Sequence, residues 1–270
     1  MSRERAIAVI DSGVGGLTVA KEVMRQLPEE RIVYVGDNAR CPYGSKSPEE
    51  IRTYSFQMID YVMRTPLKAL VIACNTATAV VLEEAIGDLP LPVIGVIEPG
   101  ARAAVQVTKN GRIGVIGTET TIRTKAYERA LLRIQPDLYV AGMACPAFVP
   151  LVESHMANTE EARSVVKETL APFLHEDLDT LILGCTHYPL LAPIISEVMG
   201  DRVRLINSAE ETARELSLQI ATDAERNQIE RPEHLFVTSG DANKFRTIAE
   251  EWLDCKVNVQ HNSLEKTVQP

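Results

Sequence analysis

The segment Leu181-Ile-Leu-Gly-Cys185-Thr186-His187-Tyr188-Pro189 joins a short apolar run to a cysteine, small polar residues and a second apolar stretch. An earlier segment, Leu70-Val-Ile-Ala-Cys74-Asn75-Thr76-Ala77, repeats the pattern. Each predicts a buried strand that leads into a helix, so its cysteine lies at the carboxyl edge of a sheet, where open α/β sheets bind ligands. A thiol at a helix N-terminus is biased toward the reactive thiolate. We therefore expect a two-thiol active site.

Apolar runs and segments of helical spacing alternate along the rest of the chain. The runs predict strands at 6–10, 32–36, 69–73, 93–97, 113–117, 138–141, 181–184, 203–206 and 235–239. The helical spacing predicts helices at 17–27, 47–62, 77–86, 123–134, 158–174, 190–199, 209–221 and 242–253, with an exposed polar linker at 222–232. This alternation predicts an α/β fold with largely parallel sheets and right-handed crossovers, in one sheet or in two. The repeated cysteine pattern favours two similar half-molecules that face one another.

Composition excludes several classes of protein. The chain has 270 residues and a net charge of −9, which argues against nucleic acid or a membrane surface as the main partner. No apolar run approaches the ~20 residues of a membrane span, and Met1-Ser-Arg-Glu-Arg5 leads directly into a strand, so we expect a cytoplasmic protein. Five cysteines, an odd number without paired spacing, predict free thiols rather than disulfides. The chain has no CxxC and no HExxH motif, so neither a zinc ribbon nor a zincin is supported, and we expect no metal.

The glycine turn Asp11-Ser12-Gly13-Val14-Gly15-Gly16 first suggests a nucleotide loop. It fails the dinucleotide template because Thr18 stands where a glycine is needed, and no Gly-Lys-Ser/Thr follows. A turn that brings backbone amides, Asp11 and Ser12 close to a small ligand fits better, although either side chain could equally cap the next helix. Cys41 is a rival nucleophile beside Arg40, but Pro-Tyr-Gly follows it rather than a helix start.

The combined motifs resemble those of the aspartate/glutamate racemase family. The residues that carry the resemblance are Asp11-Ser-Gly-Val-Gly-Gly16, Pro42-Tyr43-Gly44, Ala73-Cys74-Asn75-Thr76-Ala77, Phe148-Val-Pro-Leu-Val-Glu153 and Gly184-Cys185-Thr186-His187-Tyr188-Pro189. The resemblance implies two similar doubly wound α/β domains with mainly parallel sheets and the active site in the cleft between them. It also implies a discontinuous first domain, 1–97 plus 208–270, around a second domain, 98–207.

The same resemblance implies racemisation of glutamate without a cofactor or metal. The reaction removes the Cα proton from one face and delivers a proton to the other, which two thiols on opposite sides can do without moving. The resemblance implies that Cys74 serves D-glutamate and Cys185 serves L-glutamate, assisted by Asp11 and His187 respectively, with Glu153 supporting His187. Read without context, His187 could be a structural capping histidine and Glu153 a solvated carboxylate.

Substrate carboxylates need hydrogen-bond donors, yet the motifs contain almost no arginine or lysine. We therefore expect helix N-terminal amides to bind the substrate, with Asp11 and His187 beside it, and with the side chains or backbone of Ser12, Tyr43, Gly44, Asn75, Thr76 and Thr186. Helix caps and a plain turn are the structural alternatives for these residues.

Three alternatives remain open at this point. A sibling enzyme acting on aspartate differs by one methylene, a discrimination worth only about 1–3 kcal/mol. A non-catalytic protein that binds an acidic amino acid would leave the cysteines inert. A thiol oxidoreductase would need Cys74 and Cys185 at disulfide distance. The resemblance further implies a homodimer and a role in supplying D-glutamate for peptidoglycan.

Overall fold

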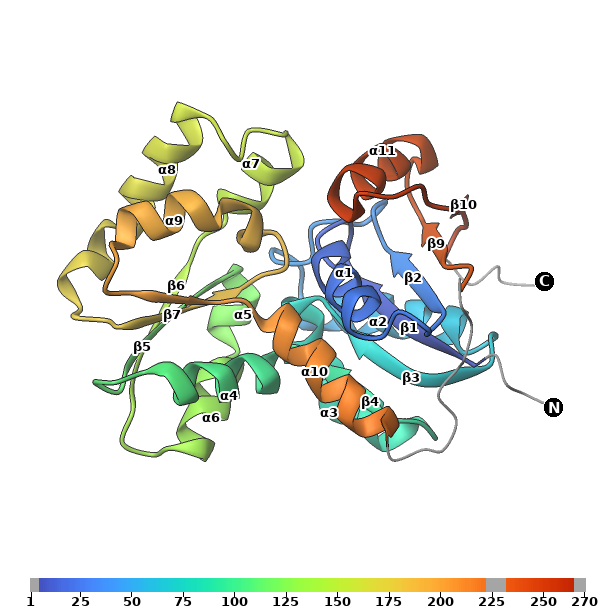
Figure 1. Ribbon diagram of the computed structural model, residues 1–270, viewed down its shortest axis with the longest axis horizontal. Helices are drawn as coiled ribbons and strands as arrows, with labels where there is room; N and C mark the ends of the chain where they lie inside the picture. The colour runs from blue at the N-terminus through green and yellow to red at the C-terminus, as the bar shows by residue number, and fades with distance from the viewer. Residues whose placement is uncertain (1–4, 222–231, 265–270) are drawn as a thin grey trace.

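The computed structural model describes residues 5–221 and 232–264, which form two parallel β-sheets flanked by helices (Figure 1). The first sheet has the order β10-β9-β2-β1-β3-β4 and the second the order β6-β5-β7-β8. The first contains β1 (Ala6–Asp11), β2 (Ile32–Gly36), β3 (Leu67–Ile72), β4 (Val93–Gly95), β9 (Leu235–Thr238) and β10 (Val259–His261). The second contains β5 (Arg112–Gly117), β6 (Tyr139–Ala144), β7 (Thr180–Gly184) and β8 (Arg204–Ile206). All observed strand pairs are parallel, which confirms the predicted fold class.

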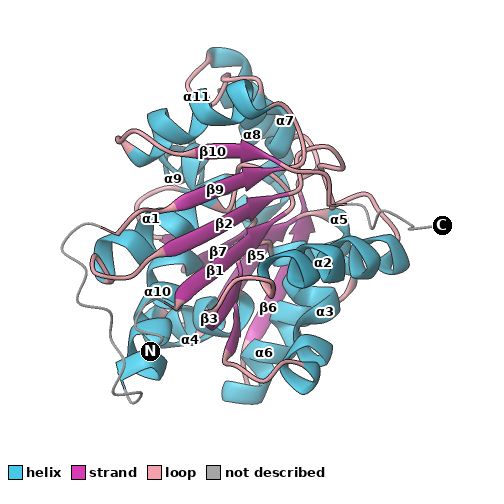
Figure 2. Cartoon of the chain, turned by 90° about the vertical axis from the view of Figure 1, so that its right-hand side faces the viewer, coloured by secondary structure: helices cyan, strands magenta, loops and turns pink. Residues whose placement is uncertain are grey.

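Helices cover both faces of the first sheet because its strands are apolar on both sides. In β1, Ile7 and Val9 point into one core and Ala8 and Ile10 into the other. The first core is completed by α1 (Leu17–Gln26), α10 (Ser208–Ala221) and α11 (Ala242–Leu253), and the second by α2 (Pro48–Val62) and α3 (Asn75–Asp88). Figure 2 shows the strands of this sheet running side by side between the two helix layers.

The second sheet has the same layered construction. Leu181 and Leu183 of β7 pack into one core, whereas Ile182 packs into the other. The first of these cores includes α7 (Phe148–Glu153), α8 (Glu160–Leu170) and α9 (Ala192–Met199), and the second includes α4 (Ile97–Val107) and α6 (Ala126–Ile134). Helix α10 packs against α1 and also against α4, so it lies between the two sheets (Figure 1).

The strand order places a crevice in each sheet. From β1 the chain crosses to β2 on one side, whereas β3 lies on the other side of β1 and continues to β4. In the second sheet β5 and β7 are neighbours that diverge to β6 and β8 in the same way. Loops at the carboxyl ends of such diverging neighbours separate and leave a ligand crevice. In the first sheet Asp11 is the last residue of β1 and Cys74 comes shortly after β3, and in the second sheet Thr118 and Cys185 directly follow β5 and β7.

Several predicted elements differ from the observed ones. The predicted strand 93–97 ends at Gly95, and the helix α4, which we did not predict, begins at Ile97. Pro99 and Gly100 read as a turn in the sequence, but proline is tolerated in the first turn of a helix. The predicted helix 123–134 is wrong at its start, because Lys125 has φ 53° and separates α5 (Glu119–Arg123) from α6. The short strand β10 and helix α7 were also not predicted.

The long helix predicted at 158–174 is shorter at both ends. Thr159, rather than Asn158, caps α8 by accepting a hydrogen bond from the Ala162 amide. The chain tightens into a 3₁₀-helix at Ala171–His175. Of the predicted linker 222–232, all but Pro232 lies outside the described residues.

The first sheet is built from two separated parts of the chain. Strands from 6–95 and 235–261 form the first sheet, and strands from 112–206 form the second. The boundaries at 97/98 and 207/208 stay predictions. Within 5–221 and 232–264, the structure has no helix that is both long and apolar enough to span a membrane.

Candidate active site

Both cysteines of the repeated motif line one small cavity between the two sheets. Its volume is about 20 Å³, which is room for about one water molecule. The cavity is lined by Ser12, Cys41, Pro42, Tyr43, Gly44, Cys74, Asn75, Thr76, Thr118, Val149, Cys185, Thr186 and His187. The structure therefore brings the predicted site residues together, with Asp11 and Glu153 just behind this lining. An amino acid can enter only if the walls separate.

Cys74 caps the N-terminus of α3. Its sulfur accepts a hydrogen bond from the Ala77 amide at 3.5 Å and lies 3.6 Å from the Ser12 hydroxyl oxygen. Burial, followed by the negative charge of Asp11, raises the pKa of Cys74 to about 12. The two hydrogen bonds work in the opposite direction but do not outweigh burial. With the cavity closed, Cys74 is therefore a neutral thiol that can give a proton.

Asp11 reaches across to the second sheet's loop. One carboxylate oxygen accepts a hydrogen bond from the Gly13 amide at 2.9 Å, and the other accepts one from the Thr186 hydroxyl at 3.4 Å. Complete burial raises the pKa of Asp11, and the positive charge of His187 opposes the rise. No hydrogen bond joins Asp11 to Cys74 in the described part of the chain, so their link is electrostatic.

Gly15 shows how closely the two loops approach. A Cβ atom added there would lie 2.3 Å from the Thr186 hydroxyl oxygen and 2.6 Å from the His187 ring. Only a glycine leaves room for this contact. The glycine turn thus serves as a close-packing surface against the second cysteine loop rather than as a phosphate cradle.

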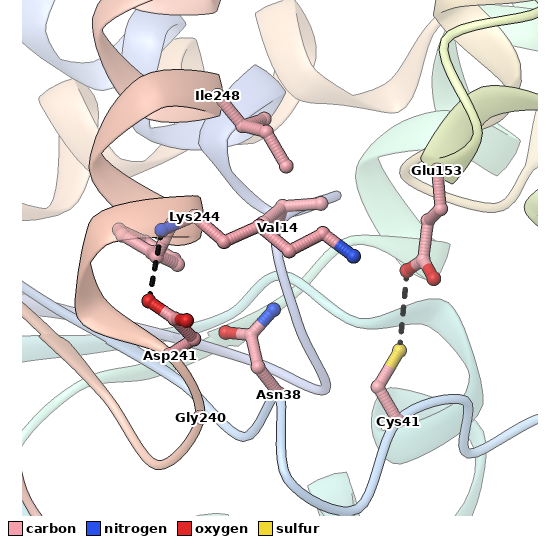
Figure 3. Close-up of a pocket in the computed structure, with 9 residues that line it drawn as sticks. Val14, Asn38, Cys41, Glu153, Gly240, Asp241, Lys244 and Ile248 are labelled. Atoms are coloured by element: carbon pink, nitrogen blue, oxygen red, sulfur yellow. Dashed lines mark hydrogen bonds between the residues drawn. The ribbon is translucent and has the colours of Figure 1, made fainter.

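Cys185, His187, Glu153 and Cys41 form a chain of polar contacts. Nδ1 of His187 lies 3.8 Å from the sulfur of Cys185, and its Nε2 lies 3.1 Å from Oε1 of Glu153. The same oxygen of Glu153 accepts a hydrogen bond from the Cys41 thiol at 3.3 Å (Figure 3). The chain links the first sheet's loop to the second cysteine.

The environment of His187 favours its charged form. Burial by itself lowers the pKa of His187, but the hydrogen bonds that it donates to Cys185 and Glu153 and the charges of Cys185 and Asp11 raise it to about 10. The hydrogen bond with His187 also lowers the pKa of Glu153, against the effect of burial. An imidazolium between a thiol and a carboxylate can pass a proton to either neighbour.

The segment after Cys185 is not the helix start that the sequence predicted. A 3₁₀-helix, Tyr188–Leu191, follows first, and α9 begins only at Ala192. An α-helix N-terminus therefore lies at Cys74 and not at Cys185, whose polar partner is His187.

Asn75 is held by a residue that the sequence did not reveal. The Tyr127 hydroxyl, on α6, donates a hydrogen bond of 2.7 Å to Oδ1 of Asn75. Nδ2 of Asn75 is buried and has no hydrogen-bond partner in the described structure, although a buried polar group normally has one. Asn75 lines the cavity, so its amide is a donor available to a bound carboxylate.

Other predicted binding residues are engaged differently. The Tyr43 hydroxyl donates to buried Asp37 at 2.5 Å, so it holds the loop in place instead of facing the cavity as a free donor. The Thr76 hydroxyl lies 2.8 Å from that of Thr118, which was not among the predicted site residues. Thr118 directly follows β5. Its position at the end of a strand is the feature of the sequence that could have identified it as a site residue.

Cys41 lies at the cavity, but its surroundings suppress its reactivity. Burial, with the negative charges of Glu153 and Asp11, raises the pKa of its thiol far above the usual range. All five cysteines are free, as predicted, so Cys74 and Cys185 do not form a disulfide. Among residues 5–221 and 232–264 there is no group of three or more His, Cys, Asp or Glu side chains that could hold a metal ion.

Comparisons with known proteins identify relatives over almost the full chain. The Asp/Glu/Hydantoin racemase family model matches residues 7–216. A glutamate racemase of Bacillus cereus is 53% identical over 268 residues, covering 98% of this chain and 100% of the relative. A glutamate racemase isoform of Bacillus anthracis, solved by crystallography, superposes with a TM-score of 0.95 at 49% identity, covering 97% of this chain and 99% of that one. A glutamate racemase of Francisella tularensis, solved in complex with D-glutamate, superposes with a TM-score of 0.91 at 32% identity. The match covers 98% of this chain and 99% of that one.

Proposed function

The chain belongs to the Asp/Glu/Hydantoin racemase family, and we propose that it interconverts L- and D-glutamate with Cys74 and Cys185 as paired acid and base. The observation that carries this proposal is that two free thiols from different sheets line one small cavity. Relatives at about half identity over nearly the whole chain are glutamate racemases, which favours glutamate over aspartate.

The reaction needs the two cysteines in opposite protonation states, one as thiolate base and the other as thiol acid. In one direction the Cys185 thiolate takes the Cα proton of L-glutamate, and the Cys74 thiol gives its proton to the opposite face. The products are D-glutamate, a Cys185 thiol and a Cys74 thiolate, and the reverse steps convert D-glutamate to L-glutamate. The raised pKa of Cys74 suits its thiol to the role of acid in the L-to-D direction.

The transition state needs stabilisation of negative charge as it develops on the substrate. The α3 N-terminus and the unpartnered amide of Asn75 supply donors at the cavity. Asp11 and Glu153 keep protons near the two sulfurs, Asp11 by its charge and Glu153 through His187. Proton transfer by positioned groups of this kind typically contributes about 10²–10⁴-fold.

A deuterium-exchange assay tests this function. The protein is incubated with L-glutamate in D₂O without added cofactor, and optical rotation and Cα deuterium are followed, with L-aspartate in a parallel sample. We expect racemisation of glutamate, with deuterium appearing mainly in the product isomer. Faster turnover of aspartate would favour an aspartate racemase. Binding of glutamate without deuterium exchange at Cα would favour a non-catalytic binding protein.

Variants of the cysteines test the mechanism in the same assay. Cys74→Ala and Cys185→Ala should each lose racemisation by at least about 10²-fold, because each removes one of the two proton-transfer groups. Cys255→Ala is the matched control, since Cys255 is exposed and far along the chain from both motifs. Full turnover by either active-site variant would contradict the two-thiol mechanism.

The physiological role follows from the product. We extend the proposal to a homodimer that works in the cytoplasm and supplies D-glutamate for peptidoglycan, on the strength of the family resemblance. Light scattering in solution measures the oligomeric state. Growth of a bacterium that requires D-glutamate, with and without this gene, tests the supply role, and failure of the active protein to restore growth would count against it.

A further inference from the structure

A second cavity lies directly outside the candidate active site, between α11 and the C-terminal end of α7 (Figure 3). Its volume is about 260 Å³, large enough for several water molecules or a small amino acid. The polar groups in its wall include Asn38, Cys41, Glu153, Asp241 and Lys244. This outer cavity is more than ten times as large as the inner one, which holds about 20 Å³.

The two cavities share a wall. Cys41 lines both of them, and Glu153, which lines the outer cavity, accepts hydrogen bonds from Cys41 and from His187 of the inner cavity. The Cys41–Glu153 hydrogen bond joins the loop after β2, in the part of the chain that forms the first sheet, to the end of α7, which packs on the second sheet. This hydrogen bond must break if the two sheets move apart. Opening at this point would connect the outer cavity to the cysteines.

Charge makes the entry of an acidic substrate difficult. A dicarboxylic amino acid has a net negative charge, and so do the side chains of Asp11, Glu153 and Asp241 near its path. Lys244 is the one lysine or arginine among the residues lining these two cavities, and in the outer cavity it is the one basic side chain. It forms no ion pair with any residue in 5–221 or 232–264, although its charge is felt at Glu153. Figure 3 shows its side chain extending from α11 across the cavity toward Glu153.

Asn38 offers a second donor in the same space. Its side-chain oxygen accepts a hydrogen bond from the Thr238 hydroxyl at 2.9 Å, which leaves the amide nitrogen for another partner. Figure 3 shows this nitrogen turned into the cavity. An ammonium and an amide on facing walls can both bind one carboxylate.

We propose that the outer cavity is a substrate vestibule, in which Lys244 and Asn38 bind a carboxylate of the dicarboxylic amino acid before the Cys41–Glu153 contact opens. The assignment rests on the proposed function. The vestibule offsets the repulsion by the acidic groups and raises the rate of substrate capture. A charge at the rim of a binding site acts mainly on the association rate and its salt dependence.

The test is Lys244→Met, which removes the charge from an exposed position while keeping the aliphatic stem. We expect kcat/KM to fall about fivefold through KM, with kcat unchanged and with a weaker dependence of kcat/KM on ionic strength. Lys244→Arg should retain the wild-type values. Lys167→Met, on the exposed face of α8, makes the same change in net charge and should leave both parameters unchanged.

Stopped-flow fluorescence of Trp252, the only tryptophan of the chain and a residue of α11, measures glutamate association directly. Its rate constant should fall about fivefold in Lys244→Met. Equal association rates in the wild-type protein and Lys244→Met would overturn the vestibule proposal. A change confined to kcat and its pH profile would also overturn it and would show that Lys244 acts only on Glu153. Absence of racemisation by the wild-type protein would instead count against the proposed function, and the association rate would still decide the vestibule.

Discussion

Cys74 and Cys185 reach one cavity from two different sheets, close enough that the charge of Cys185 adds to burial and to Asp11 in raising the pKa of Cys74. Two thiolates at this separation disfavour each other, since like charges in a buried site raise each other's proton affinity. The arrangement therefore disfavours ionisation of both cysteines at once, and a racemisation in either direction requires only one thiolate beside one thiol. The residues around this pair support five predictions.

Replacing Glu153 by Gln keeps a hydrogen-bonding side chain but removes its negative charge. The hydrogen bond that His187 donates to Glu153 helps to raise the pKa of His187 to about 10, so the pKa of His187 should fall in the variant. If catalysis needs charged His187, the loss of kcat at alkaline pH should move from about pH 10 to lower pH, with kcat reduced about tenfold at pH 8. Rate profiles from pH 6 to 10.5 measure this shift. Glu83→Gln, an exposed site on α3, serves as the control, and an unchanged alkaline limb in Glu153→Gln would contradict the assignment.

Stability should also depend on His187. Its pKa is raised from 6.5 to about 10 on folding, so its contribution is fully present below pH 6.5 and is lost as the pH rises toward 10. At about 1.4 kcal/mol per pKa unit, the upper limit is about 5 kcal/mol. The wild-type free energy of unfolding should therefore fall between pH 6.5 and 9.5, and His187→Asn should show a smaller fall. Urea unfolding at the two pH values measures the difference, and parallel losses in both proteins would rule out this contribution.

The amide of Asn75 should bind substrate rather than stabilise the fold. Asn75→Ala removes the buried donor that has no partner in the described structure, so KM should rise about tenfold, the effect of about 1.4 kcal/mol. Thr78→Val, on the same helix, removes a hydroxyl that donates to the Ile72 carbonyl. This control should lower stability by about 1 kcal/mol and leave KM unchanged.

A variant of Tyr127 tests the role of Asn75 in substrate binding by a second route. Tyr127→Phe removes the hydrogen bond that orients the amide, so KM should rise in this variant as well. If the tyrosine acts through Asn75, the double variant Tyr127→Phe/Asn75→Ala should have the KM of Asn75→Ala alone. Additive effects of the two changes on KM would show that Tyr127 acts independently.

The contact at Gly15 should be essential for closing the site. In Gly15→Ala the new methyl group would lie 2.3 Å from the Thr186 hydroxyl oxygen, so the loops must separate and kcat should fall at least about tenfold. Gly87→Ala is the matched control, because no atom lies within 4 Å of the added methyl and the helix should gain about 0.5–1 kcal/mol. Steady-state kinetics and thermal melting distinguish the two effects. Unchanged kcat in Gly15→Ala would show that the close approach is not needed for catalysis.

Local sequence patterns predicted most of the secondary structure, and they were wrong where tertiary contacts override local preference. The run Glu98-Pro99-Gly100 has the composition of a turn, yet it lies in the first turn of α4, where the helix packs against α6 and α10. The separation of α5 from α6 at Lys125 depends on a left-handed backbone that a lysine seldom adopts. Neither the start of α4 nor the break at Lys125 can be recognised from the few residues around it in the sequence.

The amino-acid sequence by itself determined the parallel α/β fold, the two cysteine turns and the cluster of polar residues at strand ends, because apolar periodicity and turn chemistry are local properties of the chain. The tertiary structure alone decided which strand ends face each other. It paired Glu153 with both His187 and Cys41, brought Tyr127 to Asn75 and set Lys244 beside the entrance. These contacts join residues far apart in the chain. They arise because burying the apolar faces of two sheets brings the sheets' diverging edges together, and no local pattern specifies that packing.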